Sequence, residues 1–173
     1  DTIMTELQKA QRELLAFLQE NYRLVSLSIE TNYRSIFEAA RKRTDYVAYV
    51  QKQLLGYFSK IVPTMESSED SRQFMRMTGK FDYLFQVHDS INDLFTVKKV
   101  MNENYIELKS DVLLPVREIS GLSLTMFDDV QDLLKEGVQH DLIHSSDALQ
   151  ASLDKTNREM LALMGDPSRR DVG

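Results

Sequence analysis

The chain has 173 residues, 42% of them hydrophobic and 28% charged, a composition that supplies a sizeable core and argues against disorder along the whole length. Its formal net charge is −6 and its basic clusters are short, so it lacks the electrostatic footprint of a nucleic-acid-binding protein. Six Gly and three Pro are too few for the turns of an all-β fold, which leaves an all-α class.

Two long helices are predicted at the start of the chain, over residues 2–30 and 33–62. Apolar residues recur there every three or four positions, the period of an amphipathic helix. Thr31 and Asn32 form the only plausible break, because Thr and Asn favour helix caps over helix interiors. A single bent helix through both segments is the alternative.

The third helix is predicted over residues 68–101. Pro63 ends the second helix, since the residue before a proline avoids the α region. The stretch Ser67–Asp70 is typical of a capped helix start. The turn that follows the third helix is expected at Asn102–Asn104.

Two further helices are predicted over residues 110–134 and 141–164. Ser110 and Asp111 cap the first of them, and Gly137 ends it. The tail over residues 166–173, which follows Gly165 and contains Pro167, is predicted to be disordered.

Long helices, short connections and heptad-like spacing predict one antiparallel up-down bundle of about five long helices over residues 1–165. The tyrosines and phenylalanines sit mostly at helical spacing and are predicted to be core. A three-helix core is expected over about residues 33–105, with the other helices on its flanks.

Polar residues interrupt two apolar seams. The heptad series of the second helix places Arg43 where an apolar residue is expected, and that of the third helix places His88 there. Asp45 and Asp89 lie beside these interruptions. Bundles build metal sites from such inward carboxylates and imidazoles. The alternative is a buried ionic or hydrogen-bonded patch that fixes the register of the helices.

Other chemistry is weakly represented. His140 and His144 lie one helical turn apart and could bind a divalent metal, but a pair on the surface by chance is the stronger interpretation. Asp128, Asp129 and Asp132 have the spacing of a solvated face. The chain has no Cys, no Gly-rich phosphate loop and no nucleophile elbow, so it is not expected to be an enzyme. No apolar run approaches the roughly 18 residues that span a bilayer.

Two segments resemble a known family. Residues 83–91, Tyr-Leu-Phe-Gln-Val-His-Asp-Ser-Ile, are similar to the helix of PhoU-like domains that reads Leu-Glu-Arg-Ile-Gly-Asp. Residues 41–47, Arg-Lys-Arg-Thr-Asp-Tyr-Val, are similar to the other carboxylate helix of that family, in which Glu is followed after three residues by Asp. The pattern looks most like the C-terminal cytoplasmic PhoU-like domain of bacterial sodium/phosphate cotransporters. The resemblance is best over residues 33–105.

In that family the Glu and Asp of each motif supply oxygen ligands to iron or zinc clusters. This chain keeps Asp45 and Asp89 but has Arg41 and Phe85 in place of the other acids. The resemblance therefore implies at most a degenerate iron or zinc site at Asp45, Asp89 and His88, and no other cofactor.

The resemblance further implies a regulatory domain at the cytoplasmic face of the inner membrane. Its expected partners are a membrane transporter portion of the same polypeptide, which the start at Asp1 rather than Met suggests lies upstream, and a second copy in a homodimer. Two alternatives stay open. One is a signalling or scaffold bundle. The other is a metal-dependent bundle enzyme that uses Asp45, Asp89, Asp129 and the pair His140 and His144.

Overall fold

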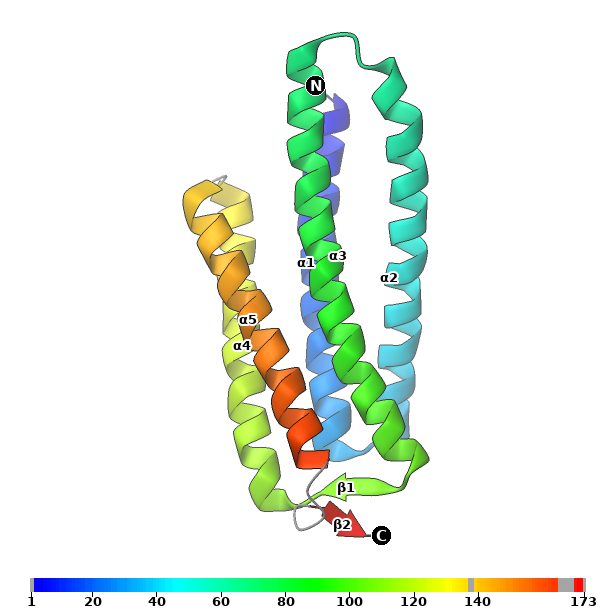
Figure 1. Ribbon diagram of the computed structural model, residues 1–173, viewed down its shortest axis with the longest axis vertical. Coiled ribbons are helices and arrows are strands. Elements are labelled where there is room, and N and C mark those ends of the chain that lie inside the picture. Colours follow the sequence, from blue (N-terminus) through cyan, green and yellow to red (C-terminus); the bar gives the residue numbers. More distant parts are fainter. Residues whose placement is uncertain (1, 137–138, 165–169, 173) are drawn as a thin grey trace.

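The computed structural model describes residues 2–136, 139–164 and 170–172, and it is built almost entirely of helix (Figure 1). The helices are α1 (Thr2–Thr31), α2 (Arg34–Ile61), α3 (Ser68–Glu103), α4 (Ser110–Glu136) and α5 (Gln139–Met164). Successive helices run in opposite directions, so the chain forms an antiparallel up-down bundle (Figure 1). The predicted all-α class and the five long helices are confirmed.

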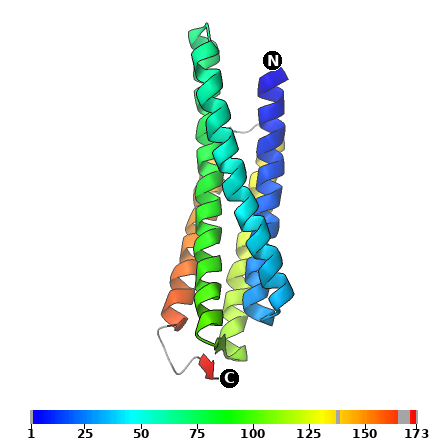
Figure 2. The same ribbon diagram turned by 90° about the vertical axis from the view of Figure 1, so that its right-hand side faces the viewer.

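The centre of the bundle is formed by α1 and α3. The α4–α5 hairpin packs on one side of this pair, and α2 packs against α1 and α3 at the edge of the molecule (Figures 1 and 2). The core takes side chains from all five helices. The predicted three-helix core over about residues 33–105 differs from this arrangement. That range holds only two long helices, and the apolar seam of α1 supplies more of the buried core than α2 does.

The α1–α2 break is a two-residue connection at Asn32 and Tyr33. Asn32 has a φ of 56°, in the left-handed region that Asn tolerates better than most residues. Its backbone N–H donates to the carbonyl of Ser28, which closes the end of α1. The two segments are therefore separate helices rather than one bent helix.

The α2–α3 connection contains a 3₁₀ turn, η1 (Val62–Thr64), with Pro63 in its first positions. The helix α3 then starts with a capping hydrogen bond, in which the backbone N–H of Asp70 donates to Ser67 Oγ at 3.0 Å. Glu69 and Asp70 add acidic side chains in the first turn, where the helix dipole favours negative charge.

We expect Ser67→Ala to lower the free energy of unfolding by about 1 kcal/mol, because it leaves the Asp70 N–H at the start of α3 without its acceptor. Urea denaturation measures the change. Ser67→Asp, which restores an acceptor, should recover most of it. A loss of the same size in both variants would show that the cap is not the cause.

The lower end of the bundle carries a small antiparallel sheet of β1 (Ile106–Leu108) and β2 (Arg170–Val172) (Figure 1). Ile106 pairs with Val172, and Leu108 pairs with Arg170. Residues 170–172 belong to the tail over 166–173 for which disorder is predicted, and in the structure they pair with the connection between α3 and α4. The remaining residues of that tail lie outside the described ones.

Candidate functional site

The three predicted metal ligands do not converge. Asp45 on α2 and Asp89 on α3 are exposed, whereas His88 is buried with 6% of its surface accessible. Among the described residues, no three His, Asp or Glu side chains form a group that could hold a metal ion. Neighbouring residues on a helix point about 100° apart, so Asp89 turns outward where His88 turns inward.

His88 behaves as a core residue. Its Nδ1 is buried and has no hydrogen-bond partner among the described residues. Burial lowers the pKa of His88, and the nearby charge of Asp89 opposes that shift without cancelling it. The imidazole is therefore held neutral at pH 7.

This burial predicts that the chain loses stability on mild acidification. The ordinary pKa of histidine, 6.5, applies to the unfolded chain, whereas the pKa of His88 in the folded chain is lower. The unfolded state then binds more protons between the two pKa values, so the free energy of unfolding falls as the pH drops through 6.5, by at most about 1.4 kcal/mol per pH unit. Urea denaturation between about pH 7.5 and 5.5 should show this fall.

His88→Gln should flatten the pH dependence in that window. The matched control is His144→Gln on α5, where the side chain is exposed. If both variants keep the slope of the parent chain, the dependence does not come from His88.

The residues of the enzyme alternative are also dispersed. Asp129 and His144 are exposed, and the side chain of His140 lies outside the described residues. Asp128 accepts a hydrogen bond from Gln19 Nε2 at 2.6 Å, which joins α4 to α1. No described catalytic constellation links these groups to Asp45 or Asp89.

Arg43 does form the buried polar contact that its position in the seam indicated. Its Nε donates to Asn21 Oδ1 at 2.6 Å, and one terminal nitrogen donates to the carbonyl of Phe17 at 3.3 Å. The guanidinium also lies 3.7 Å from the centre of the Phe17 ring, a cation–π contact. Because Asn21 is fully buried, these bonds fix the register of α2 on α1.

A surface that the sequence did not predict lies on the outer side of α2. Tyr46 and Tyr49 are stacked with ring centroids 6.3 Å apart, and they are 54% and 59% exposed. Tyr57 follows further along the helix at 41% exposure. These three residues are called here the aromatic face of α2. The prediction that the tyrosines are core is wrong for them, because α2 is at the edge of the bundle and buries only one side.

The anchoring of the aromatic face comes from α1. The ring of Phe17 packs against Tyr46 with centroids 5.5 Å apart, and Arg43 covers the Phe17 ring. Tyr46 is thus held in place although more than half of its surface is exposed. A tyrosine that is already ordered loses little conformational entropy when a partner covers it.

A second unpredicted group surrounds Lys98, which is 2% exposed. Its Nζ donates to Asn32 Oδ1 at 2.6 Å, and Asn32 Nδ2 donates to Glu107 Oε1 at 2.6 Å. Burial lowers the pKa of Lys98, and the charge of Glu107 partly opposes the shift. The three side chains tie α3, the α1–α2 connection and β1 together, so their evident role is structural.

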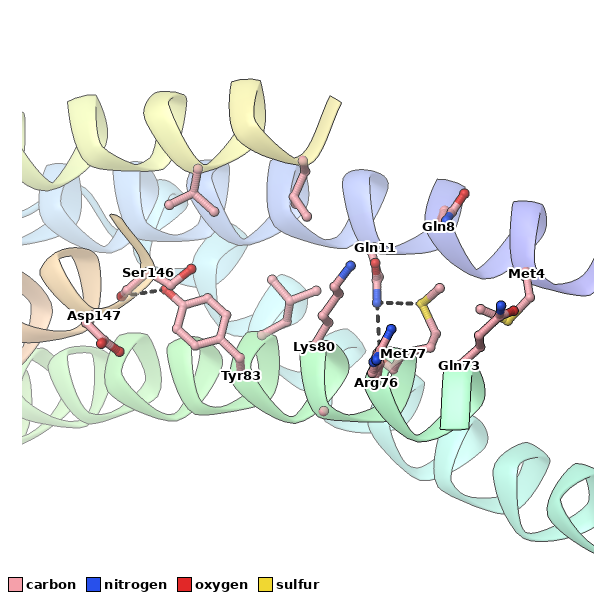
Figure 3. Close-up of a pocket in the computed structure, with 14 residues that line it drawn as sticks. Met4, Gln8, Gln11, Gln73, Arg76, Met77, Lys80, Tyr83, Ser146 and Asp147 are labelled. Carbon is pink, nitrogen blue, oxygen red and sulfur yellow. Dashed lines mark hydrogen bonds between the residues drawn. The ribbon is translucent and has the colours of Figure 1, made fainter. Parts of the chain in front are cut away.

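An open groove with a volume of about 830 Å³ lies between the upper parts of α1 and α3 (Figure 3). Met77 and Leu84 of α3 line it, and so do Val130 and Leu134 of α4. Gln11 of α1 is buried against it and donates to the carbonyl and the sulfur of Met77, at 3.2 and 2.7 Å. It is called here the α1–α3 groove.

Comparison with known proteins identified no relative. No protein-family model, no curated protein and no solved structure matches the chain. Within the described residues, none of the helices combines the length and the apolar character that crossing a membrane requires.

Proposed function

We propose that the chain is a PhoU-like accessory domain that regulates a sodium-dependent phosphate cotransporter by docking, at the cytoplasmic face of the inner membrane. Its partner would be the transporter portion of the same polypeptide. The domain would bind and bias transport without catalysing a reaction. The resemblance of residues 41–47 and 83–91 supports the choice of transporter, and the aromatic face of α2 is the observation that carries docking.

The aromatic face has the properties of a contact surface. Tyrosine is enriched at the centre of protein interfaces because it offers a large apolar ring together with a polar end. Half of the exposed large apolar side chains described belong to residues 33–62. The helix that bears them covers the core from one edge only, so a partner can reach the face without displacing another helix (Figure 2).

Regulation by such docking requires that the transporter bind the domain differently in two of its states. The aromatic face is suited to this because it is anchored by Phe17 and Arg43 of the bundle. A rigid surface makes different contacts with the two states of the transporter, whereas a flexible surface can adapt to both.

The test is sodium-dependent uptake of radiolabelled phosphate by cells that express the full-length polypeptide. Tyr46→Ser combined with Tyr49→Ser should change the uptake rate severalfold compared with the parent, without lowering the amount of protein in the membrane. The control is Tyr105→Ser, because Tyr105 is 83% exposed and lies in the turn after α3.

Uptake that depends on sodium but is unchanged by the double variant would refute docking through the aromatic face. Cells in which the gene has no effect on phosphate uptake would refute the transporter assignment. Light scattering on the purified chain measures its mass in solution and therefore tests separately whether the chain forms a homodimer. A dimer that the double variant dissociates would assign the aromatic face to a second copy instead of to the transporter.

A further inference from the structure

The α1–α3 groove lies where two helices of the bundle stop. The helix α4 ends at Glu136 and α5 starts at Gln139, whereas α1 and α3 continue well beyond this level (Figures 1 and 3). Above this level, no helix of the described residues covers the side of the α1–α3 pair that α4 and α5 cover lower down (Figure 1). The groove extends along residues 73–84 of α3, about 16 Å or three helical turns at 1.5 Å per residue.

The α1 wall of the groove continues the surface that binds α4. Lower down, Tyr22 of α1 packs against Phe127 of α4 with ring centroids 5.9 Å apart. Leu15 and Gln8 precede Tyr22 by seven and fourteen positions, an interval that returns to nearly the same face of a helix. Leu15 is fully buried, whereas Gln8 is exposed and lines the groove.

The α3 wall continues the surface that binds α5 in the same way. Ser90 Oγ donates to Asp154 Oδ1 of α5 at 3.2 Å, and Tyr83, seven positions earlier, donates its hydroxyl to the carbonyl of Ser146 at 2.8 Å. Seven positions earlier again is Arg76, which lines the groove. The two walls therefore have the spacing of a surface that packs against helices, and it is unfilled at this level.

The charged residues that line the groove indicate that its occupant carries negative charge. Arg76 and Lys80 line it, and neither makes an ion pair or a hydrogen bond with a residue that the structure describes. Lys80 is half-buried, and burial without a compensating carboxylate lowers its pKa. Asp147, on α5, is the one acidic residue among the described residues of the lining. An acidic side chain placed over the cations would supply the missing negative charge.

We propose that the α1–α3 groove binds an acidic amphipathic helix of a partner protein, about three turns long. The apolar side of that helix would lie on Met4, Tyr83 and Leu134, which line the groove and are only partly buried. Its carboxylates would pair with Arg76 and Lys80. This binding does not depend on the identity of the transporter and uses a surface separate from the aromatic face of α2. A helix fits better than a lipid chain because both walls repeat at seven residues.

The binding test uses two fluorescent peptides of about 14 residues, two heptads with Leu at the a and d positions. One carries Glu at the flanking positions and the other carries Lys. Fluorescence anisotropy at low ionic strength measures the affinity of each for the chain. Because the chain has a net charge of −6, overall charge favours the Lys peptide. We expect the opposite preference, with the Glu peptide binding about tenfold more tightly or better.

Two variants locate the binding. Arg76→Glu combined with Lys80→Glu should reverse the preference between the peptides, and Gln8→Trp should weaken the Glu peptide by filling the groove without changing its charge. The matched controls are Lys52→Glu combined with Lys60→Glu, and Gln53→Trp. These residues are exposed on α2 and are not part of the groove. Circular dichroism verifies that each variant is folded.

The expected result is tight binding of the Glu peptide that both groove variants weaken and both controls leave unchanged. Equal or tighter binding of the Lys peptide would overturn the proposal, and so would a Glu peptide whose affinity the groove variants do not alter. A further arm measures cosedimentation with vesicles of anionic phospholipid. Vesicle binding that the double groove variant abolishes, with no binding of the Glu peptide, would identify a lipid site instead of a helix site.

Discussion

Replacement of Phe58 by alanine is expected to lower the free energy of unfolding by about 3–5 kcal/mol, the range for deleting a buried phenylalanine. Among the described residues of α2 after Val47, Phe58 is the one that is buried. Its ring packs edge-on against Phe74 with ring centroids 5.4 Å apart, and against Phe81 with centroids 5.6 Å apart. Without the Phe58 ring, the part of α2 beyond residue 50 loses its buried packing against α3. Urea denaturation measures the loss.

Hydrogen exchange should locate the same effect. The backbone amides of α2 beyond residue 50 should exchange faster in Phe58→Ala, with smaller changes in α4 and α5. Tyr57→Ala is the control, because Tyr57 is adjacent in sequence but 41% exposed. Tyr57→Ala should lower the free energy of unfolding by no more than about 1 kcal/mol. Uniform acceleration over all five helices would mean that α2 does not open independently.

Arg43→Ala is the second substitution with a large expected effect, about 2–4 kcal/mol of lost stability. It removes two hydrogen bonds from a charged donor and a cation–π contact. It also leaves Asn21, which is fully buried, without a partner for its carbonyl oxygen. Among the described residues Asn21 Nδ2 already has no hydrogen-bond partner, so the whole amide would then be buried and unpaired. Chemical denaturation measures the loss.

A double-mutant cycle separates the hydrogen bonds from the packing. Asn21→Leu combined with Arg43→Met replaces both partners by apolar groups of similar size, and such a replacement is often nearly neutral. The double variant should be more stable than Arg43→Ala. Arg43→Lys should not restore the stability of the parent chain, because an ammonium group cannot reproduce the planar guanidinium over the Phe17 ring. Additive losses in the cycle would show that the pair is not coupled.

Most of the helical architecture could be predicted from the sequence, because helix boundaries depend on local signals. Ser67 and Pro63 mark the connection between α2 and α3, and Asn32 marks the break between α1 and α2. The two strands were missed because three residues are too few for an alternating pattern to stand out. Their pairing is also long-range, and helical periodicity carries no information about it.

The candidate sites were less predictable because they depend on which faces meet. A heptad pattern identifies the inward side of a helix but not the neighbour that covers it. Tyr46 and Tyr57 have helical spacing and still lie outside, since α2 packs at the edge of the bundle. The α1–α3 groove depends on where α4 and α5 end relative to α1, which only the three-dimensional arrangement shows (Figure 1).

The pairing of β1 with β2 has a consequence for the order in which the chain folds. The helices α1, α2 and α3 are consecutive in sequence and meet through short connections, so they can associate early. The strands pair only after the whole of α4 and α5 has folded back between them, and such a long loop is slow to close. The sheet should therefore be the last element to form on refolding. It should also be the first part of the folded chain to open, although Leu108 in β1 is buried.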